Sequence, residues 1–212
     1  MRALSALTDD LFAPAMVHLV DDAEGGIRYW PGAIETGTAQ HWFDLLHAHA
    51  AWTHLQRPMY DRIVDVPRLL ANYAVDALPA DLPLAQLLAC VQARAPAPYS
   101  RIGMNLYRDG HDSVAMHGDK LHTVAAGHPI TLVSLGAPRR MLIRAREGRR
   151  ETLAVDLAPG SVLSMSHASQ STHEHGIPKT RRAQGPRISV VFRVRPDSVP
   201  LPAQRGEGAE GG

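Results

Sequence analysis

The sequence RIGMNLYRDGHDSVAMHGD (residues 101–119) joins a strand-like run, a polar turn and a His-x-Asp pair. The apolar residues at 102, 104 and 106 alternate with other residues, and a period of two predicts a half-buried β-strand. Five more β-type runs follow, each next to turn-forming residues such as Gly and Pro: 129–136, 139–145, 151–157, 161–166 and 187–195. Strands this closely spaced predict a sandwich or barrel rather than βαβ units.

Two helical patterns precede residue 101. The first covers residues 39–52 behind a candidate N-cap, Thr38, and the second covers residues 83–95 behind Asp81. Their apolar stripes are Trp42, Leu45, Leu46 and Ala50 in the first helix and Leu84, Leu87, Leu88 and Val91 in the second. We therefore expect a mostly β protein with flanking helices.

The expected organisation has three parts. Residues 100–195 form the β core, and residues 1–99 form an N-terminal extension whose two helices pack on that core. Residues 196–212 are rich in Pro and Gly and have no apolar period, so we expect a disordered tail.

The composition is typical of a soluble protein with one core. Apolar residues make up 45% of the chain, and no run approaches the roughly 18 apolar residues of a membrane span. The first ten residues become acidic too early for a secretory signal. Cys90 is the single cysteine, which excludes an internal disulfide and fits a reducing compartment. We expect a cytoplasmic protein without a membrane partner, and the sequence leaves its oligomeric state open.

Charge is distributed unevenly. Residues 1–100 hold 6 Lys and Arg against 11 Asp and Glu, whereas residues 101–195 hold 15 against 7. A basic half of this kind attracts polyanions such as nucleic acid. A solvated basic face or a small anionic substrate explains the same imbalance, so charge alone leaves the partner open.

His117 and Asp119 are candidate metal ligands because residues two apart in an extended chain face the same side. A third ligand must come from elsewhere, and the segment STHEHGIPK (171–179) supplies His173 and His175 at the same spacing. Two histidines and one carboxylate form the facial arrangement that binds non-haem Fe(II) and leaves positions open for other ligands. Spacing alone does not choose between His173 and His175.

Arg187 lies 12 residues after His175, at the start of an apolar β-type run. A buried guanidinium there requires an anion, because an unpaired interior charge is costly. A co-substrate with a carboxylate would meet that requirement through a bidentate pair. The pattern predicts an iron site with an acidic co-substrate.

Three blocks of the sequence resemble the AlkB family of Fe(II)/2-oxoglutarate-dependent dioxygenases, which remove alkyl groups from nucleic-acid bases. The blocks are NLYRDGHDSVAMHGD (105–119), SLGAPRRMLIR (134–144), and ASQSTHEHGIPK (168–179) with GPRISVVFR (185–193). They are similar to the family's Asn-x-Tyr and His-x-Asp signatures, a core strand, and its distal His with an Arg-x5-Arg strand. The resemblance implies a double-stranded β-helix, or jelly-roll, core.

The resemblance also implies roles for individual residues. His117, Asp119 and His175 would hold Fe(II), and the Gly-Ile-Pro-Lys that follows His175 favours it over His173. Arg187 would pair with the distal carboxylate of 2-oxoglutarate, and O2 would be the second co-substrate.

Three further residues would contact 2-oxoglutarate by the same resemblance. Arg193 lies six residues after Arg187 on the same side of the strand and would approach the end of the co-substrate near the iron. Asn105 and Tyr107 share a strand face and would hydrogen-bond the co-substrate. Without the resemblance, Asn105 is equally well explained as a strand-end cap and Tyr107 as a core aromatic.

A nucleic-acid substrate would present its target base from a single strand or flipped out of a duplex. Tyr60 and Tyr73 would stack on a base, although core packing explains each of them as well. Arg68 lies in a segment similar to a substrate lid. Candidates for a phosphate-facing surface are Arg139, Arg140, Arg149, Arg150, Lys179, Arg181 and Arg182.

Lys120 and Leu121 follow the His-x-Asp pair, where repair members of the family often carry acidic residues that reach an exocyclic amine. Three functions remain open. The first is a base dealkylase that releases formaldehyde, succinate and CO2. The second is a dioxygenase of the same scaffold acting on a protein or small molecule, and the third is a non-catalytic nucleic-acid sensor. The complete set of candidate ligands with Arg187 argues against the third.

Overall fold

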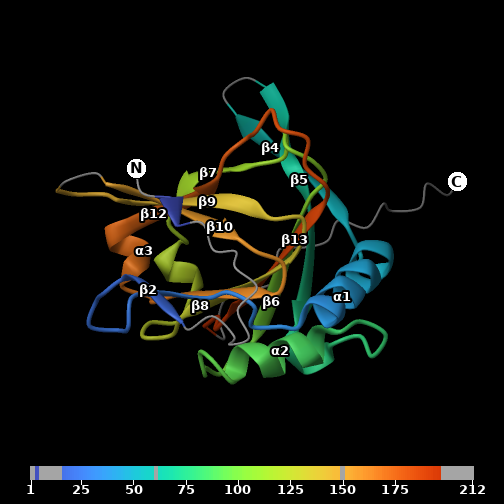
Figure 1. Ribbon diagram of the computed structural model, residues 1–212, viewed down its shortest axis with the longest axis horizontal. Coiled ribbons are helices and arrows are strands. Elements are labelled where there is room, and N and C mark those ends of the chain that lie inside the picture. Colours follow the sequence, from blue (N-terminus) through green and yellow to red (C-terminus); the bar gives the residue numbers. More distant parts are fainter. Residues whose placement is uncertain (1–2, 5–15, 60–61, 149–150, 197–212) are drawn as a thin grey trace, which may run out of the picture.

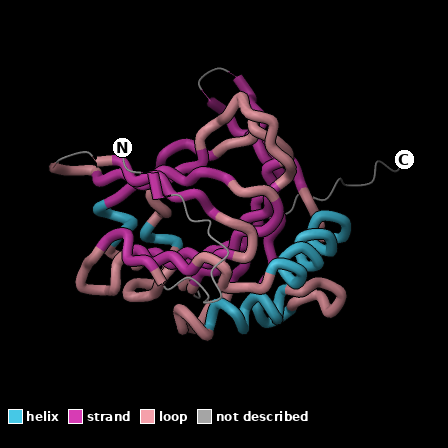
Figure 2. Tube along the Cα trace, in the orientation of Figure 1, coloured by secondary structure: helices cyan, strands magenta, loops and turns pink. Residues whose placement is uncertain are grey.

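The computed structural model describes residues 3–4, 16–59, 62–148 and 151–196. Two sheets pack face to face, and helices lie against the outer face of the larger sheet (Figure 1). Figure 2 shows the same division, with strands in two layers and the two longer helices on one side. The expected mostly β architecture with flanking helices, and its jelly-roll type, are confirmed.

In the larger sheet, strands that are far apart in the described sequence lie next to each other. From edge to edge it contains β2 (Val17–Val20), β3 (Ile27–Trp30), β11 (Ser161–Met165), β8 (Ile130–Gly136), β13 (Arg187–Arg193), β6 (Arg101–Tyr107), β5 (Arg62–Ala74) and β4 (Thr53–Met59). The smaller sheet contains β1 (Ala3–Leu4), β10 (Thr152–Leu157), β9 (Arg139–Ala145), β12 (His173–Ile177) and β7 (Val114–His117). Every pairing except β1 with β10 is antiparallel.

All six strands predicted from the sequence are present, with ends shifted by at most two residues. Four strands from the N-terminal part, β2 to β5, join the larger sheet and were not predicted. Strands β7 and β12 were not among the predicted β-type runs either, because β7 has only four residues and β12 carries polar residues in place of an apolar alternation.

Strand β13 separates the two hydrophobic cores by its alternation. Ile188, Val190 and Phe192 face the helices, whereas Arg187 and Val191 face the space between the sheets. The helix-side core includes α1 (Thr36–His49) and α2 (Leu84–Gln92), and the inter-sheet core is formed by residues from both sheets. Arg187 is thus a charged residue buried between two otherwise largely apolar sheet faces.

The predicted helix caps are wrong. Helix α1 begins at Thr36, and the carboxylate of Glu35 accepts hydrogen bonds from the backbone N–H of Gly37 at 2.7 Å and of Thr38 at 2.8 Å. The helix thus begins before Thr38, and the Glu35 side chain reaches forward to two of its unpaired backbone N–H groups. Helix α2 has Pro83 at its N-cap, without a side-chain cap, so Asp81 does not cap it.

The buried face of α1 also differs from the predicted stripe. Ala39, Phe43 and Leu46 are buried, whereas Trp42 and Leu45 are only partly covered. Helix α2 buries Leu84, Leu87 and Val91 as predicted. Within the described ranges, no helix combines the length and apolar character needed to cross a membrane.

Candidate metal and co-substrate site

His117 and His175 lie opposite each other on the antiparallel pair β7 and β12. Their ring centroids are 4.6 Å apart, and the register of the two strands slips between His175 and Ile177. Both imidazoles line a cavity of about 180 Å³ between the two sheets. Residues 58 positions apart in sequence thus form one side of a common site.

Asp119 lies two residues beyond β7 and lines the same cavity. Its backbone N–H donates to Oε1 of Gln170 at 3.0 Å, and its carboxylate accepts two hydrogen bonds at 3.1 Å from Nη2 of Arg193. Burial alone would raise the pKa of this carboxyl, but Arg193 and the two histidines outweigh it and leave the pKa lowered. Asp119 is therefore an ionised oxygen donor.

His175 is suited to bind a metal as a neutral imidazole, and one ring nitrogen of His117 is oriented by the backbone. Burial, and then the neighbouring His117, lower the pKa of His175 to about 4. Nδ1 of His117 lies 2.8 Å from the carbonyl oxygen of Ala115. A proton on Nδ1 would be donated to that oxygen, and the lone pair of Nε2 would then be available to a metal. Metal-bound histidines in proteins are commonly oriented by such a carbonyl contact.

The donor types fit Fe(II), although the three side chains do not form a closed cluster as they stand. Within the described residues, no group of three His, Cys, Asp or Glu side chains is positioned to hold a metal ion. The carboxylate of Asp119 is engaged by Arg193 instead. A metal bound by the two histidines would compete with Arg193 for that carboxylate.

Arg187 is fully buried and incompletely paired. Its Nε donates to Oγ of Ser134 at 2.9 Å, whereas Nη1 and Nη2 make no hydrogen bond to any residue that the structure describes. Burial lowers the pKa of Arg187 to about 10, so the side chain remains a cation at neutral pH. Its Cζ lies 5.2 Å from the centre of the Tyr107 ring, a stabilising contact that leaves both terminal nitrogens without an acceptor.

The cavity connects these features. The residues that line it include the unpaired Arg187 and the three candidate metal ligands, together with Asn105, Tyr107, Ser189 and Arg193. Arg187 belongs to the larger sheet, whereas His117 and His175 belong to the smaller one. An acid with one carboxylate at Arg187 and oxygen donors at its other end would match this arrangement.

A second, larger cleft of about 790 Å³ adjoins the cavity, because the linings of the two share residues. The shared residues are Arg68, Val114, His117, Asp119 and Arg193. The candidate metal ligands thus lie where the small cavity meets a cleft large enough for a substrate.

Arg68 stands on the wall between these two spaces. Its Nε donates to Oδ1 of Asn105 at 2.7 Å, and its Nη1 donates to the carbonyl oxygen of Ser113 at 3.2 Å. Because the carbonyl end of the Asn105 amide is occupied, its NH2 group is the end left for the cavity. The structure places Arg68 at the site, as a residue that orients Asn105 and fixes the chain just before β7.

The sequence model of the 2OG-Fe(II) oxygenase superfamily matches residues 72–193, which is more than half of the chain. The chain belongs to this superfamily. A DNA oxidative demethylase ALKBH2 from Bos taurus is 33% identical over 97 residues, covering 42% of this chain and 35% of the relative. Alpha-ketoglutarate-dependent dioxygenase alkB homolog 3 from Mus musculus is 26% identical over 188 residues, covering 79% of this chain and 66% of the relative.

These relatives support the AlkB branch of the superfamily, and the match spans 35% of the Bos taurus ALKBH2 sequence and 37% of the Homo sapiens one. Solved structures support the fold. OsALKBH1 superposes with a TM-score of 0.60 at 14% identity, covering 85% of this chain and 100% of that one. A 2OG-Fe(II) oxygenase family oxidoreductase from Burkholderia pseudomallei has a TM-score of 0.50 at 16% identity, covering 79% and 85%.

Not every predicted site residue of this oxygenase-family chain lies at the cavity. Tyr73 packs in the helix-side core, and its hydroxyl accepts a hydrogen bond from the backbone N–H of Ala51 at 3.0 Å. The base-stacking role predicted for Tyr73 is therefore wrong, because the ring is on the opposite face of the larger sheet from the cavity. Tyr60, Arg149 and Arg150 lie outside the described residues.

His173 shares the face of β12 with His175 but does not line the cavity. Nδ1 of His173 lies 2.9 Å from Oγ1 of Thr172. Burial lowers the pKa of His173 by more than the nearby Asp22 raises it. The geometry therefore favours His175 as the partner of His117.

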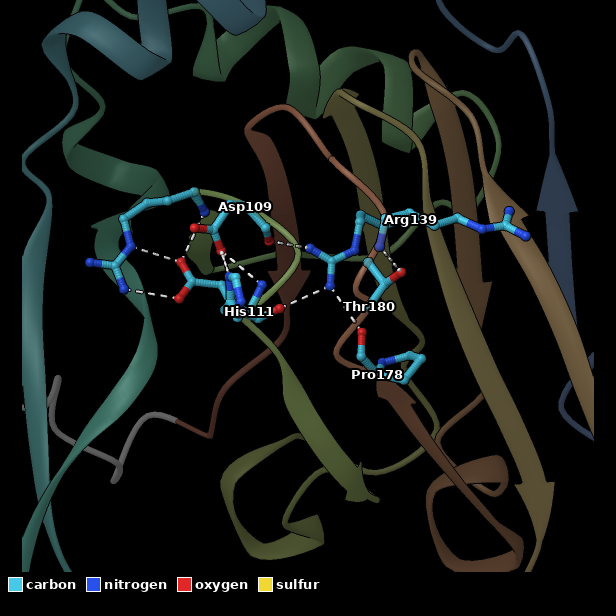
Figure 3. A network of polar contacts seen from close by, with 8 residues as sticks. Asp109, His111, Arg139, Pro178 and Thr180 are labelled. Atoms are coloured by element: carbon cyan, nitrogen blue, oxygen red, sulfur yellow. Dashed lines mark hydrogen bonds and ion pairs between the residues drawn. The ribbon is translucent and has the colours of Figure 1, made fainter.

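Arg139 and Arg140 are adjacent on β9 and point in opposite directions, and neither lines the cavity or the cleft. Arg140 is exposed on the outer face and forms an ion pair with Asp156 at 2.8 Å. Arg139 is 3% exposed and donates to the carbonyl oxygens of Asp109 at 2.7 Å, Asp112 at 2.8 Å and Pro178 at 3.0 Å (Figure 3). The phosphate-facing role predicted for Arg139 is wrong, because strand alternation turns this residue into the fold.

We expect Arg139→Met to destabilise the fold. The substitution leaves three carbonyl oxygens without their donor, and each buried unsatisfied acceptor costs about 1–3 kcal/mol, so a loss of about 3 kcal/mol is expected in urea unfolding. Arg140→Met is the matched control, because an exposed ion pair contributes less than about 1 kcal/mol. Equal stability of the two variants would contradict the structural role of Arg139.

Gly118 and Gln170 are site residues that the sequence did not reveal as important. A Cβ at Gly118 would lie 2.4 Å from the backbone oxygen of Gln170 and 2.7 Å from Nη2 of Arg146. Gln170 belongs to α3 (Ser169–Thr172). Its side-chain Oε1 also accepts the hydrogen bond from the backbone N–H of Asp119. The residue between the two candidate ligands therefore must be small.

We expect Gly118→Ala to destabilise the protein by about 1–3 kcal/mol, as overpacking does. Because the displaced loop carries both neighbouring ligands, metal affinity should fall by about 10–100-fold, the range seen for disturbed supporting contacts. Thermal melting and Mn(II) titration measure the two effects. Gly185→Ala is the control, because its nearest neighbour would be the Cβ of Ala137 at an ordinary 3.5 Å. Similar behaviour of both variants would contradict the close-approach argument.

Proposed function

We propose that this chain is an Fe(II)- and 2-oxoglutarate-dependent dioxygenase that removes N-alkyl groups from nucleic-acid bases. The observation that carries the proposal is Arg187, a fully buried cation with two unpaired terminal nitrogens in a cavity that also receives two histidines and an ionised aspartate. Burying such a charge is unfavourable unless an anion pairs with it. Superfamily membership supports 2-oxoglutarate as that anion.

Each residue of the cavity would have a defined task. His117, Asp119 and His175 would hold Fe(II), and Arg187 would pair with the distal carboxylate of 2-oxoglutarate. The amide NH2 of Asn105, oriented by Arg68, would donate a hydrogen bond to the co-substrate. Iron with 2-oxoglutarate and O2 would supply the oxidising chemistry, whereas the protein would position the reagents and limit the access of water.

The overall reaction balances without a further co-reactant. One oxygen atom of O2 enters succinate as 2-oxoglutarate loses CO2, and the other is inserted into a C–H bond of the N-alkyl carbon. For a methyl group, the resulting N-hydroxymethyl breaks its C–N bond and yields formaldehyde and the free base. The protein must therefore bring that carbon next to the metal ligands at the base of the cleft.

The cleft and the curated relatives support a nucleic-acid substrate. The cleft of about 790 Å³ opens directly onto His117 and Asp119, and a base taken out of its stack would enter there. The names of the curated relatives, which include DNA oxidative demethylases, support the same choice. We also propose a cytoplasmic location, on the basis of the single cysteine.

A protein or small-molecule substrate is the second candidate, and Lys120 favours it. Lys120 lines the cleft directly after Asp119, and Leu121 beside it is 39% exposed, so neither of these two positions offers a carboxylate to an exocyclic amine. A substrate recognised by its negative charge would fit this wall as well as an alkylated base.

The test uses purified protein loaded with Fe(II) and 2-oxoglutarate under anaerobic conditions. Oligonucleotides bearing 1-methyladenine or 3-methylcytosine are added before air is admitted, and formaldehyde, succinate and restored base are measured. We expect all three products in equal amounts. Succinate without restored base would favour the second candidate, and failure to bind 2-oxoglutarate would refute the proposed co-substrate site.

A further inference from the structure

Asp119 lies two residues beyond the end of β7, so the ladder that holds His117 opposite His175 does not reach it. The backbone N–H of Asp119 donates instead to Oε1 of Gln170 at 3.0 Å. Gln170 is 3% exposed and belongs to α3, which lies between β12 and β2 (Figure 1). The position of the Asp119 backbone therefore depends on how firmly Gln170 is held.

The surroundings of the Gln170 amide determine its orientation. A backbone N–H can only donate, so the end of the amide that faces Asp119 must be the oxygen. The NH2 end then donates to Oγ of Ser169 at 3.3 Å and to the carbonyl oxygen of Ser166 at 3.5 Å. Oγ of Ser169 donates to the same carbonyl oxygen at 2.7 Å. Both ends of the Gln170 amide are thus held.

Ser166 connects this group to the turn between β2 and β3. Its Oγ accepts from the backbone N–H of Ser169 at 3.0 Å and donates to Oδ2 of Asp22 at 2.5 Å. The other carboxylate oxygen of Asp22 accepts from the backbone N–H of Glu24 and of Gly26, both at 2.8 Å. Burial alone would raise the pKa of Asp22, but these hydrogen bonds outweigh it and leave the pKa lowered. Asp22 is therefore an ionised and strong acceptor.

The hydrogen bonds of this network all donate toward Asp22. Asp119 donates to Gln170, Gln170 donates to Ser169 and Ser166, and Ser166 donates to the carboxylate of Asp22. Ser166, Ser169 and Gln170 are each at most 3% exposed, and their side-chain protons all have acceptors. A buried polar network with every member satisfied fixes one arrangement of its side chains.

We propose that Gln170 is a positioning residue that sets Asp119 for metal binding, and that Asp22 anchors Gln170 through Ser166. This inference rests on the metal site of the proposed function and adds the residues that hold its carboxylate ligand in place. Because Arg193 engages the Asp119 carboxylate, a metal must compete for it. A backbone that is already fixed reduces the entropy cost of that exchange.

The first test replaces the acceptor at Gln170. Gln170→Met keeps the length of the side chain, and we expect Mn(II) affinity to fall by about 10–100-fold, as for other lost supporting contacts of a metal ligand. The Asp119 amide should also lose protection from hydrogen exchange. Gln170→Glu, which keeps an oxygen toward Asp119, should recover most of the affinity. Ser171→Ala is the matched control on α3, because Ser171 is exposed and its Oγ donates to the carbonyl oxygen of Ala168.

The second test reverses one hydrogen bond at the far end of the network. In Asp22→Asn the amide oxygen still accepts from the turn, but its NH2 group cannot accept the proton of Ser166. We expect Mn(II) affinity to fall by about 2–30-fold, the range for coupling through a contiguous network. Combined with Gln170→Met, this substitution should add little, because Asp22 acts through Gln170. Asp21→Asn is the control, since the Asp21 side chain is 89% exposed.

The outcomes separate this inference from the proposed function, and melting curves without metal verify that each variant is folded. Additive losses in the double variant would overturn the connection to Asp22. Full Mn(II) affinity in Gln170→Met would overturn the positioning role and leave the proposed function intact. Failure of the parent chain to bind Mn(II) would refute the proposed metal site. Exchange at the Asp119 amide would still decide whether Gln170 holds that residue.

Discussion

Replacing Arg187 with Met is expected to weaken co-substrate binding by about 30-fold or more while leaving the free protein at least as stable as the parent chain. The two effects have one cause. The guanidinium is fully buried and its two terminal nitrogens are unpaired, so without an anion the charge is a cost to the fold. Apolar replacement of buried charges is often neutral or stabilising by about 1–4 kcal/mol.

When 2-oxoglutarate is bound, the effect of the substitution on stability changes sign, and the variant becomes the less stable protein. Truncating one partner of a buried, hydrogen-bonded charge pair costs about 2–5 kcal/mol, which corresponds to a loss of about 30-fold or more in affinity for 2-oxoglutarate. In thermal melts, Mn(II) with 2-oxoglutarate should stabilise the parent chain by about 2.7 kcal/mol at 100 times the dissociation constant. The Arg187→Met variant should show little of this stabilisation at the same concentration.

Two comparisons sharpen the Arg187 experiment. Arg187→Lys keeps the charge but loses the planar fork, so an intermediate affinity is expected. Arg140→Met should respond to the co-substrate as the parent chain does, because Arg140 is exposed on the outer face and paired with Asp156. A free Arg187→Met protein that melts well below the parent, yet still binds 2-oxoglutarate, would show that Arg187 is a structural residue.

Removing His175 is expected to eliminate metal binding, whereas removing His173 is expected to preserve it. The two residues share a strand face, but only His175 lies opposite His117 and lines the cavity. Disturbing a supporting contact of a metal ligand costs about 10–100-fold in affinity, so loss of a ligand should cost more than about 100-fold. His175→Ala should therefore also lose turnover.

The measurement is Mn(II) binding followed by the decrease in the signal of the free ion in electron paramagnetic resonance. His173→Ala is the matched control, because its Nδ1 contacts Thr172 rather than the cavity. Melting curves without metal verify that each variant is folded. Retained metal binding in His175→Ala together with its loss in His173→Ala would reverse the assignment.

The parts of the fold that the sequence predicted are those with local signals. Strands β6 and β13 alternate clearly, and Arg187 stands out because a charge interrupts an apolar run. Strands β7 and β12 carry His117 and His175 but are too short for a clear local pattern, and β12 is mostly polar, so their existence depends on the pairing of β12 with β7 and with β9. Pairing between strands so far apart in the chain cannot be predicted from the sequence of either strand alone.

The same limit explains the errors among the basic residues. Arg139 and Arg140 are identical in type and adjacent, and only the direction of β9 decides which of them is buried. The excess of positive charge after residue 101 therefore mixes residues that hold the fold together with residues that face solvent or the cleft. Counting them as one surface overestimated the phosphate-facing area.

The cavity is lined by Arg187 on the larger sheet and by His117 and His175 on the smaller sheet. A co-substrate bound at both ends would act as a tie between the layers of the sandwich, so part of its binding energy would appear as cohesion of the fold. We expect amide hydrogen exchange in β12 and β13 to slow together when Mn(II) and 2-oxoglutarate are added. Binding of the co-substrate and stabilisation of the two sheets would then occur together, and release of succinate would reverse the stabilisation.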